Sequence, residues 1–278
     1  MTIPEICIWL IWLLPLAAFA LTWIIGWIKK DSPSAPYVII ATTASWLLSL
    51  WALINVFTDG NITTSSVQWL NIGALNVKFA LELNPLSTVM LMVVNTVSLM
   101  VQIFSMGYMH GDHGYRRYFS FVALFTFSML GLVLADSLLM LFMCWELVGL
   151  CSYLLIGFWF FKPSAASAAK KAFLITRIGD LGILAALIML FNATGTFTIT
   201  ELHGLAAAGA IGSAVLTWSC LGLFLGSMGK SAQFPLHIWL QDAMEGPTPV
   251  SALIHAATMV AAGVFLKKLN KPKAQGNV

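Results

Sequence analysis

The chain has 278 residues, of which 59% are hydrophobic and only 9% are charged, and its mean hydropathy is +0.89. A water-soluble domain needs far more surface charge, so this composition excludes a soluble globular protein and indicates a polytopic membrane protein. The net charge of +3 is small, and the basic residues form no patch interleaved with aromatic residues. We therefore expect no nucleic-acid partner.

Eight membrane spans are predicted, because a helix needs about 20 mostly apolar residues to cross about 30 Å of hydrocarbon. No basic region precedes the first apolar run, which predicts a retained span and not a cleaved signal peptide. The seventh span is interrupted near Pro235. The spans cover residues 6–28, 37–57, 85–107, 118–135, 137–161, 168–192, 213–244 and 249–266.

Local signals support several boundaries of these spans. Residues 58–84 are too polar to cross a membrane, and alternation of apolar and polar residues over 74–83 predicts a short extramembrane hairpin. Asn84 before Pro85 is typical of an N-cap followed by proline in the first turn. Asp136 is placed to cap the fifth span.

Small residues inside the apolar runs are expected to serve packing. Gly222, Gly226 and Gly229 lie at the helical spacing that allows close approach of two helices. The cysteines show no Cys-x-x-Cys spacing, so we expect small buried hydrophobic side chains, without a metal site or disulfide framework. They are Cys7, Cys144, Cys151 and Cys220.

The loop charges predict the orientation of the spans. Lysine and arginine gather in the loops after the first, third and fifth spans, whereas the loops after the second, fourth and sixth carry only Lys78. The positive-inside rule then places the N-terminus outside. Residues 267–278 disagree, because their lysines follow an eighth span that should exit outside. This basic tail either breaks the rule or is not how the segment originally continued.

Ionisable side chains at membrane depth are the main functional signal, because charge in hydrocarbon is costly and rarely retained without a function. Lys230 precedes Pro235, and a proline there frees backbone carbonyls, which lipid does not tolerate but a water-lined cavity does. Arg177 and Asp180 share a helix face and can pair. The whole set comprises Glu146, Arg177, Asp180, Lys230, His237 and His255.

These groups predict a proton relay, because an acid, a base and imidazoles that titrate near neutral pH are its parts. Burial disfavours the charged form of a lysine and a nearby carboxylate favours it, so moving the carboxylate's influence would switch the lysine's proton affinity. Each of these residues could also have a purely structural role. Glu146 could be a packing charge, Arg177 with Asp180 a structural ion pair, and Lys230 a snorkelling side chain. The two histidines could be ordinary core residues.

Four segments carry the most specific motifs, namely residues 142–158, 171–180, 229–240 and 242–260. They resemble the antiporter-like proton-pumping subunits of respiratory complex I, and the resemblance covers about residues 80–266. Trp145-Glu146-Leu147-Val148-Gly149 and Glu245-Gly246-Pro247-Thr248-Pro249 are similar to the distal, largest of these subunits, which is subunit 5 of the mitochondrial complex. The related Mrp-type sodium/proton antiporters usually have alanine in place of Gly246.

The resemblance implies an all-α polytopic membrane fold of about eight transmembrane helices. Residues 1–117 would hold the first three helices with the extramembrane hairpin 58–84. Residues 118–266 would form one five-helix antiporter-like repeat with a discontinuous seventh helix, able to translocate protons. Residues 267–278 would mark the point of truncation, because family members carry a second, inverted repeat.

The resemblance also implies roles for the ionisable residues. Glu146 would be the carboxylate paired with the pumping Lys230, and His255 would pass protons along a central hydrophilic axis. Arg177 and Asp180 would modulate this pair or couple it to a neighbouring subunit. His237 would be an additional member of the relay.

No cofactor or metal is expected in this chain itself. NADH, FMN, iron–sulfur clusters and quinone would belong to partner subunits, in agreement with the absence of cysteine clusters and of a dinucleotide-binding glycine motif from the sequence. The chain would be a subunit of an H⁺-translocating NADH:quinone oxidoreductase. Its expected partners are other membrane-arm subunits, especially a neighbouring antiporter-like subunit, together with the lipid bilayer and protons.

Three alternatives remain open at this level. The chain could be an Mrp-type cation/proton antiporter subunit, which Gly246 disfavours, or a hydrogenase- or plastoquinone-linked relative of complex I. It could also be a truncated, non-pumping assembly fragment. A bacterial plasma membrane is the expected location, with an organellar inner membrane or a thylakoid membrane as the alternative.

Overall fold

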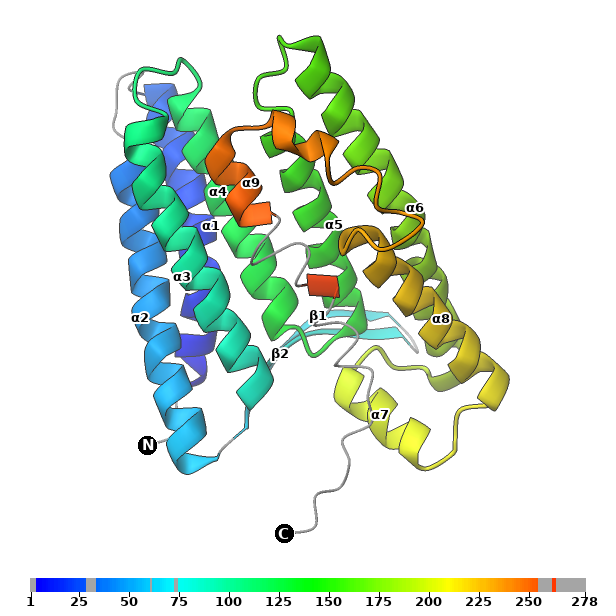
Figure 1. Cartoon of the computed structure of the whole chain (residues 1–278). Coiled ribbons are helices and arrows are strands. Elements are labelled where there is room, and N and C mark those ends of the chain that lie inside the picture. The colour runs from blue at the N-terminus through cyan, green and yellow to red at the C-terminus, as the bar shows by residue number, and fades with distance from the viewer. Residues whose placement is uncertain (1–3, 29–33, 61, 73–74, 255–261, 264–278) are drawn as a thin grey trace.

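The structure is a computed structural model that describes residues 4–28, 34–60, 62–72, 75–254 and 262–263. It is a bundle of long helices with a small antiparallel hairpin at one end (Figure 1). Within the described residues, six helices are long and apolar enough to cross a membrane. They are α1 (Glu5–Ile28), α2 (Ala35–Asp59), α3 (Pro85–Tyr108), α4 (Tyr115–Leu134), α5 (Leu138–Ile156) and α6 (Pro163–Thr194).

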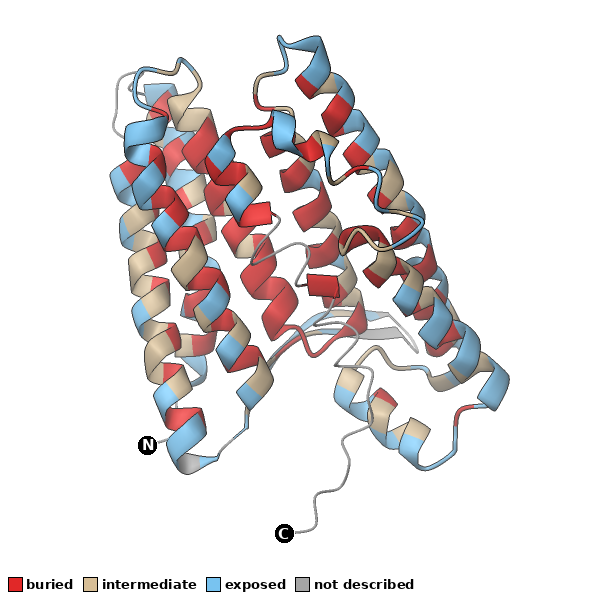
Figure 2. Cartoon of the chain, in the orientation of Figure 1, coloured by how far each residue is buried: buried red, intermediate tan, exposed pale blue. Residues whose placement is uncertain are grey.

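Burial follows the pattern of a membrane bundle. The central helices α4 and α5 are buried along most of their length, whereas the outer faces of the flanking helices are exposed (Figure 2). Large apolar side chains such as Trp27, Leu174 and Trp218 lie on these exposed faces. An apolar exterior suits contact with lipid, so the predicted multi-pass membrane fold is confirmed.

The predicted spans agree with the first four helices to within a few residues, and the next two differ at their ends. The fifth prediction, 137–161, ran beyond the true end of α5 at Ile156, because Phe158 to Phe161 are apolar but form turns. The sixth prediction began at 168, whereas α6 begins at Pro163. A proline suits the first turn of a helix, where its missing N–H has no partner to lose.

The predicted extramembrane hairpin is confirmed. Strands β1 (Thr63–Ile72) and β2 (Leu75–Leu83) are antiparallel, with an irregularity in register near the middle of β1. The predicted cap after β2 is also present. The Asn84 side chain accepts from the Ser87 N–H at 2.8 Å, and the Ser87 hydroxyl oxygen accepts from the Asn84 N–H at 2.8 Å. This reciprocal capping satisfies two N–H groups where the chain turns from the hairpin into α3.

The predicted role of Asp136 is wrong. The N-cap of α5 is Ser137, which makes no side-chain capping bond. Asp136 instead accepts from the hydroxyl of Thr200 at 2.9 Å and from its N–H at 3.3 Å, in the first turn of α7 (Ile199–Ala207). Its own N–H donates to the Ala80 carbonyl oxygen at 2.8 Å. Asp136 therefore joins the hairpin to α7, a short helix that the sequence prediction missed.

The predicted seventh span is a shorter helix than expected. Helix α8 (Ser213–Lys230) ends five residues before Pro235, near which the break was predicted. Ala232 has a left-handed backbone conformation (φ 49°). The Gln233 N–H donates to the Met228 carbonyl oxygen at 3.0 Å, which is the six-to-one bond of a Schellman-type helix end. The helix therefore ends through its own C-terminal turn, and Pro235 lies in the following segment.

Beyond α8 the chain forms turns and then two short elements, the 3-10 helix η1 (Asp242–Glu245) and α9 (Thr248–Ala252). The predicted eighth span, 249–266, begins with α9. Most of its remainder, including His255, lies outside the described residues, as does the predicted tail 267–278.

Helices α6 and α8 pack with their backbones in close contact. A Cβ atom on Gly182 would lie 2.6 Å from the Gly222 carbonyl oxygen, and one on Gly222 would lie 2.5 Å from the Gly182 carbonyl oxygen. Further along the same contact, a Cβ atom on Gly229 would lie 3.3 Å from the Gly179 Cα. The predicted packing role of the α8 glycines is confirmed, because no larger residue fits this contact without moving one of the helices.

Replacing Gly222 by alanine should lower the free energy of unfolding of the assembled protein by about 1–3 kcal/mol, because the added methyl group overpacks the α6–α8 contact. The thermal transition temperature should fall accordingly. Gly204→Ala in α7 is the matched control, since nothing lies within 4 Å of a Cβ atom there. That variant should be neutral or slightly stabilising, because alanine favours helix over glycine. Equal transition temperatures for the two variants would contradict the close α6–α8 contact.

Candidate functional site

Lys230, the last residue of α8, is enclosed in the interior with its side chain 1% exposed. Its Nζ donates to the Trp145 carbonyl oxygen at 3.2 Å and lies 3.9 Å from an Asp180 carboxylate oxygen. The Asp180 side chain is 2% exposed. Snorkelling needs a charged head group that reaches water. The structure therefore favours a buried ion pair over the snorkelling explanation.

The surrounding helices make room for this ammonium group. A Cβ atom on Gly149 of α5 would lie 2.6 Å from Lys230 Nζ, so only glycine leaves the space that the ammonium occupies. The C-terminal end of a helix favours positive charge, and Lys230 lies at that end of α8. The Trp239 indole N–H donates to the Gly229 carbonyl oxygen at 3.0 Å, which satisfies a carbonyl near the end of α8.

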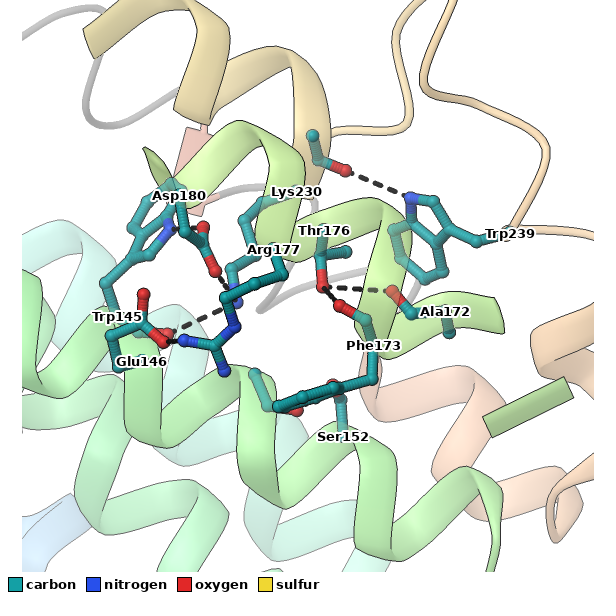
Figure 3. Close-up of polar contacts among 12 residues, drawn as sticks. Trp145, Glu146, Ser152, Ala172, Phe173, Thr176, Arg177, Asp180, Lys230 and Trp239 are labelled. Carbon is teal, nitrogen blue, oxygen red and sulfur yellow. Dashed lines mark hydrogen bonds and ion pairs between the residues drawn. The ribbon is translucent and has the colours of Figure 1, made fainter. Parts of the chain in front are cut away.

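Trp145 connects the two members of the buried pair. Its indole N–H donates to the Asp180 carboxylate at 2.6 Å, and its carbonyl oxygen accepts from Lys230. One residue of α5 thus orients the carboxylate of α6 and the ammonium of α8 (Figure 3). Trp145 lies within one of the motifs, but no role for it was predicted from the sequence. The signal was available, because an indole N–H in a membrane core needs a hydrogen-bond acceptor.

A second ion pair lies beside the first, between Arg177 of α6 and Glu146 of α5. It is more open, since the Arg177 and Glu146 side chains are 35% and 21% exposed. The Arg177 guanidinium also lies over the Phe173 ring, 4.5 Å from its centroid. The structure therefore brings four of the predicted residues together at adjacent positions between α5, α6 and α8.

The pairing differs from the one expected from the sequence. We expected Arg177 to pair with Asp180 and Glu146 with Lys230, whereas Arg177 pairs with Glu146 and Lys230 lies against Asp180. Arg177 and Asp180 do share a face of α6, but the long arginine side chain reaches across to α5. Glu146 lies about 60° around α5 from Gly149, the position that faces the Lys230 ammonium, and its carboxylate pairs with Arg177 instead.

His237 is not part of this arrangement. His237 lies in the turns between α8 and η1, is exposed, and has its ring 5.9 Å from that of Phe234. His255 lies outside the described residues. A surface ion pair that was not predicted from the sequence, Lys171 with Asp242 at 2.6 Å, joins α6 to η1. Among the residues that the structure describes, no cluster of His, Cys, Asp or Glu has the arrangement of a metal site.

Two family models match this chain. The model "NADH:quinone oxidoreductase/Mrp antiporter, TM" matches residues 135–269, which include all four residues of the two ion pairs. The model "NADH-Ubiquinone oxidoreductase (complex I), chain 5 N-terminus" matches residues 69–119.

Two curated relatives of this chain are each named as subunit or chain 5 of an NAD(P)H-quinone oxidoreductase. NAD(P)H-quinone oxidoreductase subunit 5 of the Paulinella chromatophora chromatophore is 43% identical over 270 residues, which cover 92% of this chain and 40% of the relative. NAD(P)H-quinone oxidoreductase chain 5 of Synechocystis is 50% identical over 204 residues, which cover 72% of this chain and 30% of the relative. The chain thus spans less than half of the length of these relatives.

Solved structures share the fold. A chain of the Mrp complex from Dietzia is 32% identical with a TM-score of 0.73, and the match covers 92% of this chain and 27% of that chain. A chain of an archaeal membrane-bound sulfane sulfur reductase has a TM-score of 0.79 at 22% identity, over 94% of this chain and 52% of that chain. The second likeness concerns the fold alone.

The helix arrangement and the two ion pairs, taken with these matches, define an antiporter-like transmembrane subunit. The chain belongs to the subunit 5 type of this family, that of the NAD(P)H-quinone oxidoreductases.

Removing the Asp180 charge should destabilise the assembled protein by about 3–5 kcal/mol, because Asp180→Asn leaves the buried Lys230 ammonium without its counter-charge. Adding Lys230→Met to Asp180→Asn should restore much of the loss. Glu146→Gln, at a partly exposed pair, should cost less, about 0–1 kcal/mol. The measurement is thermal stability and yield of the assembled protein in a double-mutant cycle.

The same cycle for Glu146 with Lys230 should show little coupling. A larger coupling for Glu146–Lys230 than for Asp180–Lys230 would contradict the pairing in the structure and support the one expected from the sequence.

Proposed function

We propose that this chain is a proton-translocating membrane subunit of a complex-I-type NADH:quinone oxidoreductase, coupling quinone reduction to proton pumping. The observation that carries the proposal is Lys230, an ammonium group buried at the end of α8, 3.9 Å from the Asp180 carboxylate and 3.2 Å from the Trp145 carbonyl oxygen. A titratable cation enclosed at membrane depth beside a carboxylate is suited to bind and release a proton.

The second ion pair supplies a means of control. Arg177 pairs with Glu146 in the structure, yet it stands three residues before Asp180 on the same helix. A movement of the Arg177 side chain from Glu146 to Asp180 would neutralise the carboxylate that favours protonated Lys230. Lys230 would then release its proton, and Glu146, freed from Arg177, would be available as acceptor. The onward relay through His255, with His237 as an additional member, stays a prediction.

Orientation in the membrane is part of the proposal. Arg116, Arg117 and Lys162 flank the starts of α4 and α6, at the end of the bundle opposite to the hairpin, and Lys170 and Lys171 follow in the first half of α6, whereas among the described residues Lys78 is the only lysine or arginine at the hairpin end. The positive-inside rule therefore supports an N-terminus on the outer side. We propose a bacterial plasma membrane, with an organellar inner or thylakoid membrane as the alternative.

Partners and cofactors follow from the same assignment. We propose that other membrane-arm subunits, especially a neighbouring antiporter-like subunit, contact this chain. NADH, FMN, iron–sulfur clusters and quinone would be bound by partner subunits. The chain would contribute no redox chemistry of its own.

An Mrp-type antiporter subunit is the second candidate, which the likeness to the Dietzia Mrp complex supports. The residue at position 246 favours the first candidate, because the Mrp-type antiporters usually have alanine there whereas this chain has glycine. A Cβ atom on Gly246 would lie 3.2 Å from the Ile156 Cα and 3.2 Å from the Leu155 carbonyl oxygen, so an alanine here would press on the end of α5. The glycine fits this contact without displacement of α5.

Lys230→Ala should abolish proton translocation in the fraction of the complex that still assembles, because it also leaves the buried Asp180 carboxylate without its counter-charge, and Glu146→Gln should impair translocation. NADH-driven acidification of membrane vesicles, compared with the NADH oxidation rate, measures the translocation. Lys171→Ala is the matched control, because that lysine is 43% exposed in a surface ion pair. Normal acidification by Lys230→Ala in an assembled complex would refute the pumping role and favour an assembly fragment.

Membership of a large complex has its own test. In a native gel of gently solubilised membranes with a denaturing second dimension, an antibody to residues 58–84 should detect the chain within a large NADH-oxidising assembly. Detection at this chain's own mass of 30.3 kDa would mean that another polypeptide supplies further helices. Detection at a larger mass would mean a longer subunit. Absence from every large assembly would contradict the proposed partners.

A further inference from the structure

One face of α3 is polar along most of its length although it is completely buried. Thr88, Asn95, Ser98, Gln102 and Ser105 recur at helical spacing on this face, and each is 0% exposed. They lie among the N-terminal helices, away from the ion pairs between α5, α6 and α8.

Helix α2 presents hydroxyl groups to this face. Asn95 Nδ2 donates to the Ser49 hydroxyl oxygen at 2.9 Å. Because α2 and α3 pack side by side in opposite directions, successive turns from this contact place Thr42 at the level of Gln102. Thr42 is also 0% exposed. At the far end of the face, Ser105 Oγ and the Tyr118 hydroxyl of α4 are hydrogen-bonded at 2.9 Å.

Several polar atoms of this interior have no hydrogen-bond partner within the described part of the chain. They are Asn95 Oδ1, Ser98 Oγ, both Gln102 side-chain atoms and Thr42 Oγ1. An unpartnered polar atom in a dry interior loses its bonds to water without replacement, and a bilayer offers none. Proteins commonly satisfy such groups with buried water, provided that several polar partners converge. Here the partners converge from two helices.

We propose that α2 and α3, closed at one end by Tyr118 of α4, hold a file of ordered water molecules between Asn95 and the Ser105–Tyr118 pair. These residues are ten apart, which corresponds to about 15 Å along a helix. A buried water makes about three hydrogen bonds, so the unpartnered atoms require about two waters or more. The site lies away from the two ion pairs, and it does not rest on the proposed function.

The direct test is a cryo-electron microscopy map of the assembled complex at a resolution that shows ordered water. Density peaks are expected about 2.7–3.2 Å from Gln102, Ser98 and Thr42 polar atoms. Direct pairing of these side chains with one another, or the absence of such peaks, would overturn the proposal.

A matched pair of variants tests the site independently. Gln102→Leu should remove the neighbouring peaks and lower the thermal transition temperature of the complex. Thr126→Val is the control, because that buried hydroxyl already donates to the Val122 carbonyl oxygen at 2.9 Å, and it should leave the peaks unchanged. A higher transition temperature for Gln102→Leu would mean a dry interior and would overturn the proposal. If Gln102→Leu does not assemble, Ser98→Ala, which removes one hydroxyl, should lose one peak, and unchanged density would count against the file.

Discussion

The burial of one ammonium group constrains the rest of this structure. Lys230 cannot lie in an apolar interior without a counter-charge and hydrogen bonds, because the desolvation of an unpaired charge is prohibitive. Three helices therefore have to meet at one place. Helix α6 supplies Asp180, and α5 supplies the Trp145 carbonyl and the gap at Gly149. The glycine contact between α6 and α8 follows from the same requirement, since an ammonium and a carboxylate on two helices approach only if the backbones do.

The two ion pairs lie side by side and share two helices, α5 and α6. Trp145 and Glu146 are consecutive on α5, while Arg177 and Asp180 are one turn apart on α6, so each helix contributes to both pairs. The outer pair is partly exposed and the inner pair is enclosed. A change at the surface, such as contact with another chain, can therefore act on the outer pair directly, and its consequence for Lys230 requires only a rotation of side chains that already share these helices.

The sequence specified the local features of the fold well and the contacts between helices poorly. Hydropathy identified the long helices and alternation identified the hairpin, because both signals are contained in consecutive residues. The end of α8 was misplaced because Pro235 is visible in the sequence, whereas the left-handed conformation of Ala232 is not. Spacing within α6 suggested Arg177 with Asp180, but an arginine side chain is long enough to reach another helix.

The candidate site itself was recognisable because charge in a membrane span is rare, and the structure brings four of its members together in pairs that differ from the expected ones. Neutral polar residues were overlooked because they are common in membrane spans and change the average hydropathy little. A span such as α3 remains apolar on average although one face carries Asn95, Ser98 and Gln102. Helix α4 packs against both α3 and α5, so it separates this polar face from the ion pairs. Charges need partners fixed by protein, whereas neutral amides and hydroxyls can be satisfied by water, which bridges groups whose spacing the helices do not dictate. The two interiors of this bundle therefore represent two physical solutions to polarity within a membrane.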